Sequence, residues 1–127
     1  MGDRSSIYLV SEIDDSIIRI YGHWSGTDNA VAVANLLNKT DRVGDFTYLT
    51  AQAFYEFAIV EGNYKGSTGF GIGSASYVDY TEDNPPIVLN ADTGEVKYED
   101  THYTQDEFVK AFSELLNTKV EETNVKN

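Results

Sequence analysis

The period of the hydrophobic pattern changes along this chain, and that change constrains the fold more than any other feature. From Ser5 to Tyr21, apolar and polar residues alternate with period two on either side of an acidic turn, which is typical of a strand hairpin. From Phe46 to Val60, apolar residues recur at intervals of three and four, which indicates an amphipathic helix. A chain that carries the two periods in separate blocks is expected to form an α+β domain.

The other expected elements fit the same fold class. They are a helix from Thr27 or Asp28, either of which can cap it, through Asn38, a Gly-interrupted strand from Gly69 to Gly73, a hairpin from Pro86 to Glu99, and a C-terminal helix from Gln105 to Asn117. We expect a small antiparallel sheet of about five strands, with two central helices and the C-terminal helix on one face. Residues 1–117 are predicted to form one domain, and residues 118–127 a frayed polar tail.

Composition excludes several classes of function. Of 127 residues, 21 are acidic and 9 are Lys or Arg, so the net charge of −12 opposes non-specific binding to nucleic acid or to an anionic membrane. The absence of cysteine excludes disulfides, thiolate nucleophiles and Cys-type zinc sites. No apolar stretch approaches the length of a membrane span. We therefore expect a cytoplasmic protein with no membrane contact, no metal and no cofactor.

Two segments stand out as candidate binding elements. His23 and Trp24 lie between two glycines just after a predicted strand, where His23 can donate to an anion while Trp24 stacks on a ring. The alternative is that Trp24 belongs to the core and His23 is its hydrogen-bonded neighbour. The segment from Thr68 through Gly69, Phe70 and Gly71 to Gly73 can cradle a phosphate on its backbone N–H groups, or can let another element pack closely. It is not a Walker motif, because no Lys-Ser/Thr follows.

Arginine is scarce and confined to the first third of the chain. Arg4 and Arg19 fall on adjacent predicted strands, where two guanidinium groups can form a local anion site. Intramolecular salt bridges are the alternative, given the many acidic residues available. The acidic pairs, such as Glu82 with Asp83 and Glu99 with Asp100, lack the spacing of an EF-hand and are interpreted as solvated turns.

Five tyrosines are numerous enough to predict an adhesive surface, because tyrosine is enriched at protein interfaces. They are Tyr48, Tyr55, Tyr64, Tyr77 and Tyr80. Packing on strand faces is the alternative.

Four segments taken together indicate a family. They are Arg4-Ser5, Ile20 to Gly26, Asp45 to Leu49 and Thr68 to Gly73. This combination resembles a family of small proteins from bacteriophages, prophages and bacteria, which share an Arg-led first strand, a Tyr-x-His-Trp-x-Gly element and a Thr-Gly-Phe-Gly-Ile segment. The resemblance covers residues 3 to 98. It implies a phage or mobile-element setting, and it carries no settled activity over to this chain.

Three functions remain open from the sequence. The first is a phage-type accessory or counter-defence protein without catalytic residues, whose His23, Trp24, Arg4, Arg19 and Thr68–Gly73 segment hold a small anionic or nucleotide-like ligand. The second is an acidic inhibitor that binds a host protein. The third is a small hydrolase that uses His23 and a carboxylate. In each case the Gly-rich strand favours a homo-oligomer, most simply a dimer.

Overall fold

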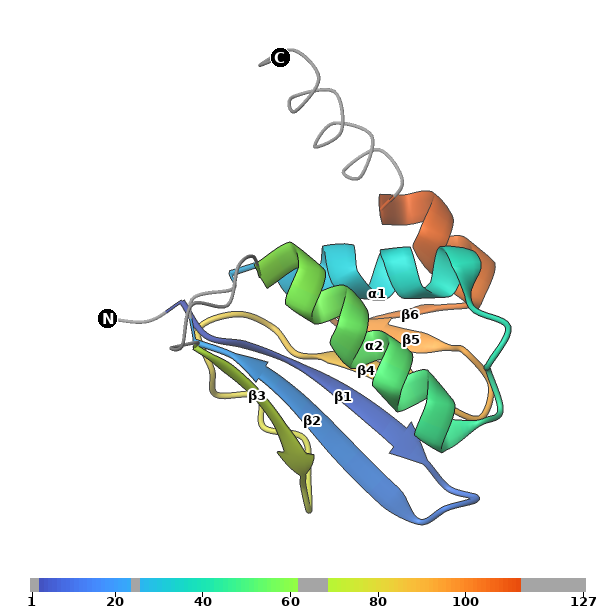
Figure 1. The fold of residues 1–127 in the computed structure, drawn as a ribbon. Coiled ribbons are helices and arrows are strands. Elements are labelled where there is room, and N and C mark those ends of the chain that lie inside the picture. Colours follow the sequence, from blue (N-terminus) through green and yellow to red (C-terminus); the bar gives the residue numbers. More distant parts are fainter. Residues whose placement is uncertain (1–2, 24–25, 62–68, 113–127) are drawn as a thin grey trace.

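The computed structural model describes residues 3–23, 26–61 and 69–112 (Figure 1). Its labelled elements, in chain order, are β1 (Ser5–Ser11), β2 (Ser16–Gly22), α1 (Asp28–Lys39), α2 (Phe46–Glu61), β3 (Phe70–Ser74), β4 (Ile87–Asn90), β5 (Val96–Tyr98) and β6 (Thr101–Tyr103). Residues 105–112 form a further helical segment, called here the C-terminal helix. The continuation of this helix to Asn117 and the tail of residues 118–127, both expected from the sequence, lie outside the described residues.

The strands form one mixed sheet with the order β3-β2-β1-β4-β5-β6. All neighbouring strands are antiparallel except β1 and β4, which run parallel. The α+β class is confirmed, with two differences from the expected sheet. A sixth strand, β6, follows a two-residue turn in which Glu99 and Asp100 both have positive φ. The parallel pair arises because the chain crosses the sheet between β3 and β4, and no local hydrophobic pattern reports such a crossing.

The two long helices and the C-terminal helix cover one face of the sheet (Figure 1). The alternation of β1 sends Ile7 and Leu9 into this layer, and Ile20 lies opposite Ile7 on β2. The helices contribute side chains that are equally buried, notably Leu36, Leu49, Phe57 and Phe108. Burial of a large apolar side chain contributes about 1.5–3 kcal/mol, so this single core stabilises the sheet and fixes which face of each strand points inward.

A side chain accepts a capping hydrogen bond at two of the three helix starts. Thr104 and Glu107 form a capping box, in which the Thr104 N–H donates to Glu107 Oε1 at 2.8 Å and the Glu107 N–H to Thr104 Oγ1 at 3.2 Å. Asp45 precedes α2 and its carboxylate accepts from the Tyr48 N–H at 3.5 Å. Thr27 caps α1 by position, but its side chain makes no capping hydrogen bond. Asn29 Oδ1 instead accepts from the Ala30 N–H at 2.8 Å.

The face of the sheet away from the helices, called here the back face, is crossed by residues 75–86. This segment, called here the acidic loop, carries Asp79, Glu82 and Asp83, and it is the yellow trace that passes behind the strands in Figure 1. Tyr8 points to this face and is nevertheless buried, because the loop lies over it. Within the described ranges, no helix is long and apolar enough to cross a membrane.

Candidate functional site

Arg19 occupies the centre of the back face, where it is paired within the chain. Its Nη2 donates to Glu82 of the acidic loop, and its Nε donates to Ser6 Oγ at 3.0 Å. Ser6 Oγ in turn donates to Glu82 Oε1 at 2.7 Å. The guanidinium carbon lies 4.4 Å from the centroid of the Tyr21 ring, which adds a cation–π contact. The Glu82 side chain is only 5% exposed, so this carboxylate is a buried counter-ion of Arg19.

Arg4 is paired in a similar way at the end of β1. Its backbone N–H donates to Asp83 Oδ2 at 2.9 Å, and its Nε approaches the same oxygen at 3.4 Å. These bonds, the backbone one first, lower the pKa of the Asp83 carboxyl below its usual value. Both side chains are well exposed to solvent, so this pair is weaker than the pair formed by Arg19. The predicted alternative of intramolecular salt bridges is therefore realised for both arginines.

His23 lies next to the same cluster. A hydrogen bond of 2.8 Å joins Tyr21 Oη to His23 Nδ1, and the His23 backbone N–H donates to the Gly69 carbonyl at 2.7 Å. Arg4, His23 and Gly69 thus lie near one end of the sheet, and Arg19 lies closer to its centre, where it contacts the Tyr21 side chain that is bonded to His23. Trp24 and Thr68 lie outside the described residues, so the choice between a stacking and a core tryptophan stays open.

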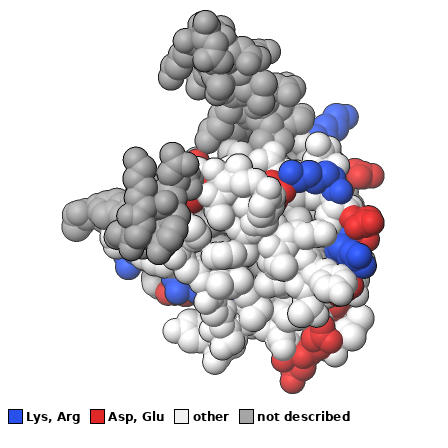
Figure 2. Space-filling view, viewed as in Figure 1, with Lys and Arg blue, Asp and Glu red and all other residues white. Residues whose placement is uncertain are grey.

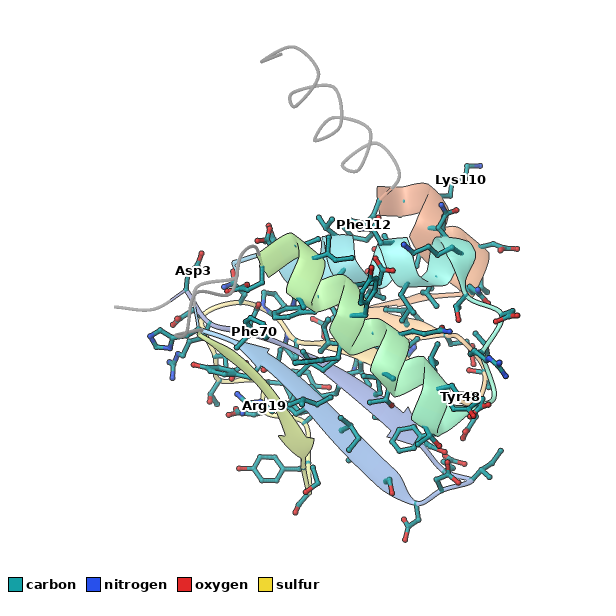
Figure 3. The ribbon with its side chains drawn as sticks, in the orientation of Figure 1. Asp3, Arg19, Tyr48, Phe70, Lys110 and Phe112 are labelled. Carbon is teal, nitrogen blue, oxygen red and sulfur yellow. The ribbon has the colours of Figure 1, made fainter. Side chains whose placement is uncertain are left out.

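The Gly-rich strand separates two of its predicted site residues onto opposite faces. Phe70 lies beneath α2, with its ring centroid 5.7 Å from that of Phe54 and 6.1 Å from that of Phe57 (Figure 3). Gly71 pairs with Tyr21 on the back face. A hollow of about 280 Å³ opens there beside Arg19, lined by Arg19, Tyr21, Gly71, Ile72, Gly73 and Ser74. Among the described atoms, none lies within 4 Å of a Cβ built on Gly71 or Gly73, so this surface has room for a small ligand.

Sequence reasoning missed a second hollow on the back face, of about 410 Å³. It lies between the acidic loop and the β5–β6 turn, and its lining includes Val88, Lys97, Glu99 and Asp100. Lys97 Nζ lies 5.6 Å from the centroid of the Tyr80 ring, so the ammonium group makes a cation–π contact with the acidic loop. The acidic pairs Glu82-Asp83 and Glu99-Asp100 line this hollow and are visible in the sequence, but only the fold brings the two pairs together. In the described part of the chain, no group of three or more His, Asp or Glu side chains is placed to hold a metal ion.

The tyrosines that the sequence marked as a candidate adhesive surface are mostly exposed. Four of the five are exposed, namely Tyr48, Tyr55, Tyr77 and Tyr80. Tyr48 projects from the first turn of α2 (Figure 3) and Tyr55 lies two turns further along, whereas Tyr77 and Tyr80 belong to the acidic loop on the back face. Tyr64 lies outside the described residues. The tyrosines therefore divide between two opposite faces.

The outer surface of α2 is unusual in so acidic a protein. It presents Tyr48, Ala51, Gln52, Tyr55 and Ile59, called here the α2 face. Residues 46–60 contain one ionisable acid or base apart from tyrosine, Glu56, which is buried and accepts an ion pair from Lys39 Nζ at 2.7 Å. Figure 2 shows this side of the molecule as a largely white surface, with charged side chains gathered toward its edges.

A hollow of about 440 Å³ adjoins the α2 face, between α1 and α2. Its lining is Leu36, Lys39, Thr40, Ala51, Gln52, Tyr55 and Glu56. An uncharged surface with exposed aromatic side chains and an adjoining hollow is the arrangement in which a few anchor side chains of a partner protein bind.

Comparison with protein-family models, with curated proteins and with solved structures finds no match.

Proposed function

We propose that this chain is a non-catalytic binding protein that recognises a partner protein through the α2 face. The observation that carries the proposal is the uncharged, tyrosine-bearing outer surface of α2 on a chain with a net charge of −12. Exposed apolar patches on monomeric proteins usually mark interaction sites, and aromatic side chains contribute large contact areas at low entropic cost.

The net charge of the chain indicates the charge of its partner. The net charge of −12 attracts a basic protein over a long range and repels acidic ones. The expected partner therefore carries a net positive charge and presents apolar side chains to Tyr55 and to the hollow beside Lys39. The hollow has room for one or two large side chains of the partner. A few such buried side chains contribute most of the binding free energy at many interfaces.

The family resemblance supplies the setting of the proposal. A phage or prophage protein of this kind acts in the cytoplasm of its bacterial host, and a binder without catalytic residues fits an accessory or counter-defence role. The partner is then a host protein whose activity the bound chain inhibits. The expectation of a homo-oligomer belongs to the same proposal, since β3 lies at the edge of the sheet.

Affinity capture with matched variants tests the α2 face. Tyr55 and Tyr77 are 64% and 70% exposed and lie on opposite sides of the sheet, so each can be changed to serine at little cost to the fold. The full chain, Tyr55→Ser and Tyr77→Ser are used to capture proteins from a bacterial lysate. The proposal predicts a stoichiometric partner that Tyr55→Ser loses and Tyr77→Ser retains. Loss of the partner only with Tyr77→Ser would place the interface on the back face instead.

A small anionic ligand is the second candidate function, and the hollow beside Arg19 favours it. That hollow is lined by Arg19 and Gly71 of the predicted ligand site, and the Arg19 side chain remains 34% exposed although it is paired with Glu82. An anion bound there has to compete with the buried Glu82 carboxylate for the same donors. Native mass spectrometry of the freshly purified protein tests it, because a stoichiometric small mass that heat releases would establish a ligand and a bare chain would exclude a tightly held one.

A further inference from the structure

The hollow between α1 and α2 has a buried carboxylate in its wall. Glu56 lines this hollow, and its side chain is only 6% exposed. Its Oε2 accepts an ion pair from Lys39 Nζ at 2.7 Å. A carboxylate removed from water stays ionised at low cost only when a cation compensates its charge. A side chain that enters the hollow therefore has to leave Glu56 with a counter-ion or supply a new one.

Lys39 is a counter-ion that can be exchanged. It is the last residue of α1, and its side chain is 60% exposed, so most of its surface faces solvent. By contrast, Arg19 beside the similarly buried Glu82 is 34% exposed, and it is also held by Ser6 Oγ and the Tyr21 ring. A lysine ammonium is a strongly hydrated charge on a flexible stem. Lys39 can thus turn into solvent at little cost, provided that another cation takes its place.

The other walls of the hollow fit an arginine side chain. Leu36 and Ala51 offer apolar surface to its methylene groups, and the exposed ring of Tyr55 offers a face on which a guanidinium can stack. The planar guanidinium donates two parallel hydrogen bonds to a carboxylate, which matches Glu56. It is also more weakly hydrated than an ammonium, so it loses less on entering a partly closed hollow.

We propose that an arginine of the partner protein enters this hollow, displaces Lys39 and binds the Glu56 carboxylate. The hollow of about 440 Å³ has room for this arginine beside an apolar side chain of the same partner. A basic partner agrees with the net charge of −12, and arginine is among the residues that dominate binding energy at interfaces. The inference rests on the proposed function for the presence of a partner on the α2 face, and it adds the chemistry of the anchor.

The exchange of cations gives the hollow its specificity. A neutral side chain that displaced Lys39 would leave the Glu56 carboxylate buried without compensation, and an acidic one would be repelled. Arginine alone combines the positive charge, the two-fold hydrogen bonding and the stacking surface that the hollow offers. The buried carboxylate therefore selects among partners as well as binding the correct one.

Nuclear magnetic resonance titration with small probes tests the guanidinium site without a partner. The full chain is titrated with N-acetylarginine amide and with N-acetylcitrulline amide, which has the same shape without the charge. N-acetyllysine amide provides a second comparison. The proposal predicts saturable shifts of the backbone amides of Ala51, Gln52 and Tyr55, with a millimolar dissociation constant for the arginine probe. Citrulline should bind at least about tenfold more weakly, and lysine at least about threefold.

Four variants locate the site. Glu56→Gln should weaken binding of the arginine probe at least about tenfold. Asp14→Asn removes the same charge from the exposed β1–β2 turn and should keep the wild-type affinity. Lys39→Gln removes the competing cation and should bind the probe about three to ten times more tightly. Lys97→Gln makes the same change in net charge on the back face and should leave the affinity unchanged.

The possible failures are distinguishable. Circular dichroism checks the fold of each variant, and if Glu56→Gln fails to fold, the comparison of probes and the Lys39→Gln variant decide the result. Absence of saturable shifts at the hollow, equal binding of arginine and either comparison probe, or wild-type affinity in Glu56→Gln would overturn the inference. A partner captured through Tyr55 together with no probe binding would overturn the arginine anchor and leave the proposed function standing. Probe binding with no captured partner would support the guanidinium site and overturn the proposed function.

Discussion

Arg19 on β2 and Glu82 in the acidic loop form an ion pair on the back face of the sheet, although 63 residues separate them in the chain. The carboxylate is almost completely buried, and Ser6 Oγ donates to it as well. The acidic loop therefore supplies, from within the chain, the anion that Arg19 was predicted to bind. The pair also fixes the loop over Tyr8, whose hydroxyl accepts from the Asp79 N–H at 3.1 Å.

Replacement of Glu82 by glutamine should destabilise the protein. The variant leaves the Arg19 guanidinium partly buried without its counter-ion, and loss of one partner of such a group costs about 1–3 kcal/mol. Urea denaturation followed by circular dichroism measures the change in the free energy of unfolding. Asp83→Asn is the matched control, because its pair with Arg4 is exposed and the change should have a smaller effect. An equal loss in the two variants would contradict the assignment of Glu82 as the anchor of the loop.

Asp92 should make the protein sensitive to acid. Its carboxylate accepts from Ser11 Oγ at 2.8 Å, which is the main cause of its lowered pKa, and also from the backbone N–H groups of Glu12 and Ile13. Because the pKa is lower in the folded state, the stabilisation is complete above the unfolded value of about 3.9 and is lost as pH falls through the lower, folded value. Asp92→Asn should therefore lose less stability than the wild-type chain between about pH 6 and about pH 2.5. Urea titrations at intervals of about half a pH unit measure this loss.

The control for Asp92 is Asp14→Asn, which removes a charge from the β1–β2 turn that Asp92 binds and leaves the Asp92 carboxylate in place. This variant should keep the wild-type slope of stability against pH in the acid range that Asp92 governs. A wild-type slope in Asp92→Asn would contradict the proposed role of its hydrogen bonds.

Two glycines should respond to alanine in opposite ways. At Gly73 the backbone is outside the left-handed region and the space around a Cβ is open within the described structure, so Gly73→Ala should leave the stability unchanged or raise it by up to about 1 kcal/mol. Gly94 has φ +83°, and a Cβ there would lie 3.1 Å from Gln105 Oε1. Gly94→Ala should cost about 1–2 kcal/mol or more, because left-handed backbone disfavours a side chain. Thermal unfolding of both variants checks the contrast, and equal melting temperatures would contradict it.

Local sequence patterns were sufficient to predict most elements of this fold. The alternation of Ile7 and Leu9, the spacing of three and four in α2, and the capping box at Thr104 each depend on residues close together in the chain. β6 was missed because its turn uses Glu99 and Asp100 rather than the Asn-Gly or Asp-Gly pair that usually marks a turn with positive φ at both positions.

The candidate site was less accessible from the sequence, because its partners are distant in the chain. Arg4 and Arg19 were recognisable as unusual, but their pairing with Asp83 and Glu82 depends on the path of the acidic loop across the back face. The α2 face was recognised only in part, because Tyr48 and Tyr55 were predicted to be adhesive but the uncharged surface around them was not. Helical spacing predicted the inner side of α2 correctly. The sequence does not show that the outer side is uncharged, because this depends on the burial of Glu56, which pairs with Lys39.

The most direct test of the α2 face is photocrosslinking in cells. A photoreactive phenylalanine analogue replaces Tyr55 in the full chain, and the same analogue at Tyr77 provides the control on the back face. Irradiation of bacteria that express each protein is followed by mass measurement of the adducts. The account predicts one discrete adduct from position 55, heavier than the chain and different from twice its mass, and none from position 77. Adducts from position 77 alone, or no protein adduct together with a stoichiometric small anion in the native mass spectrum, would contradict it.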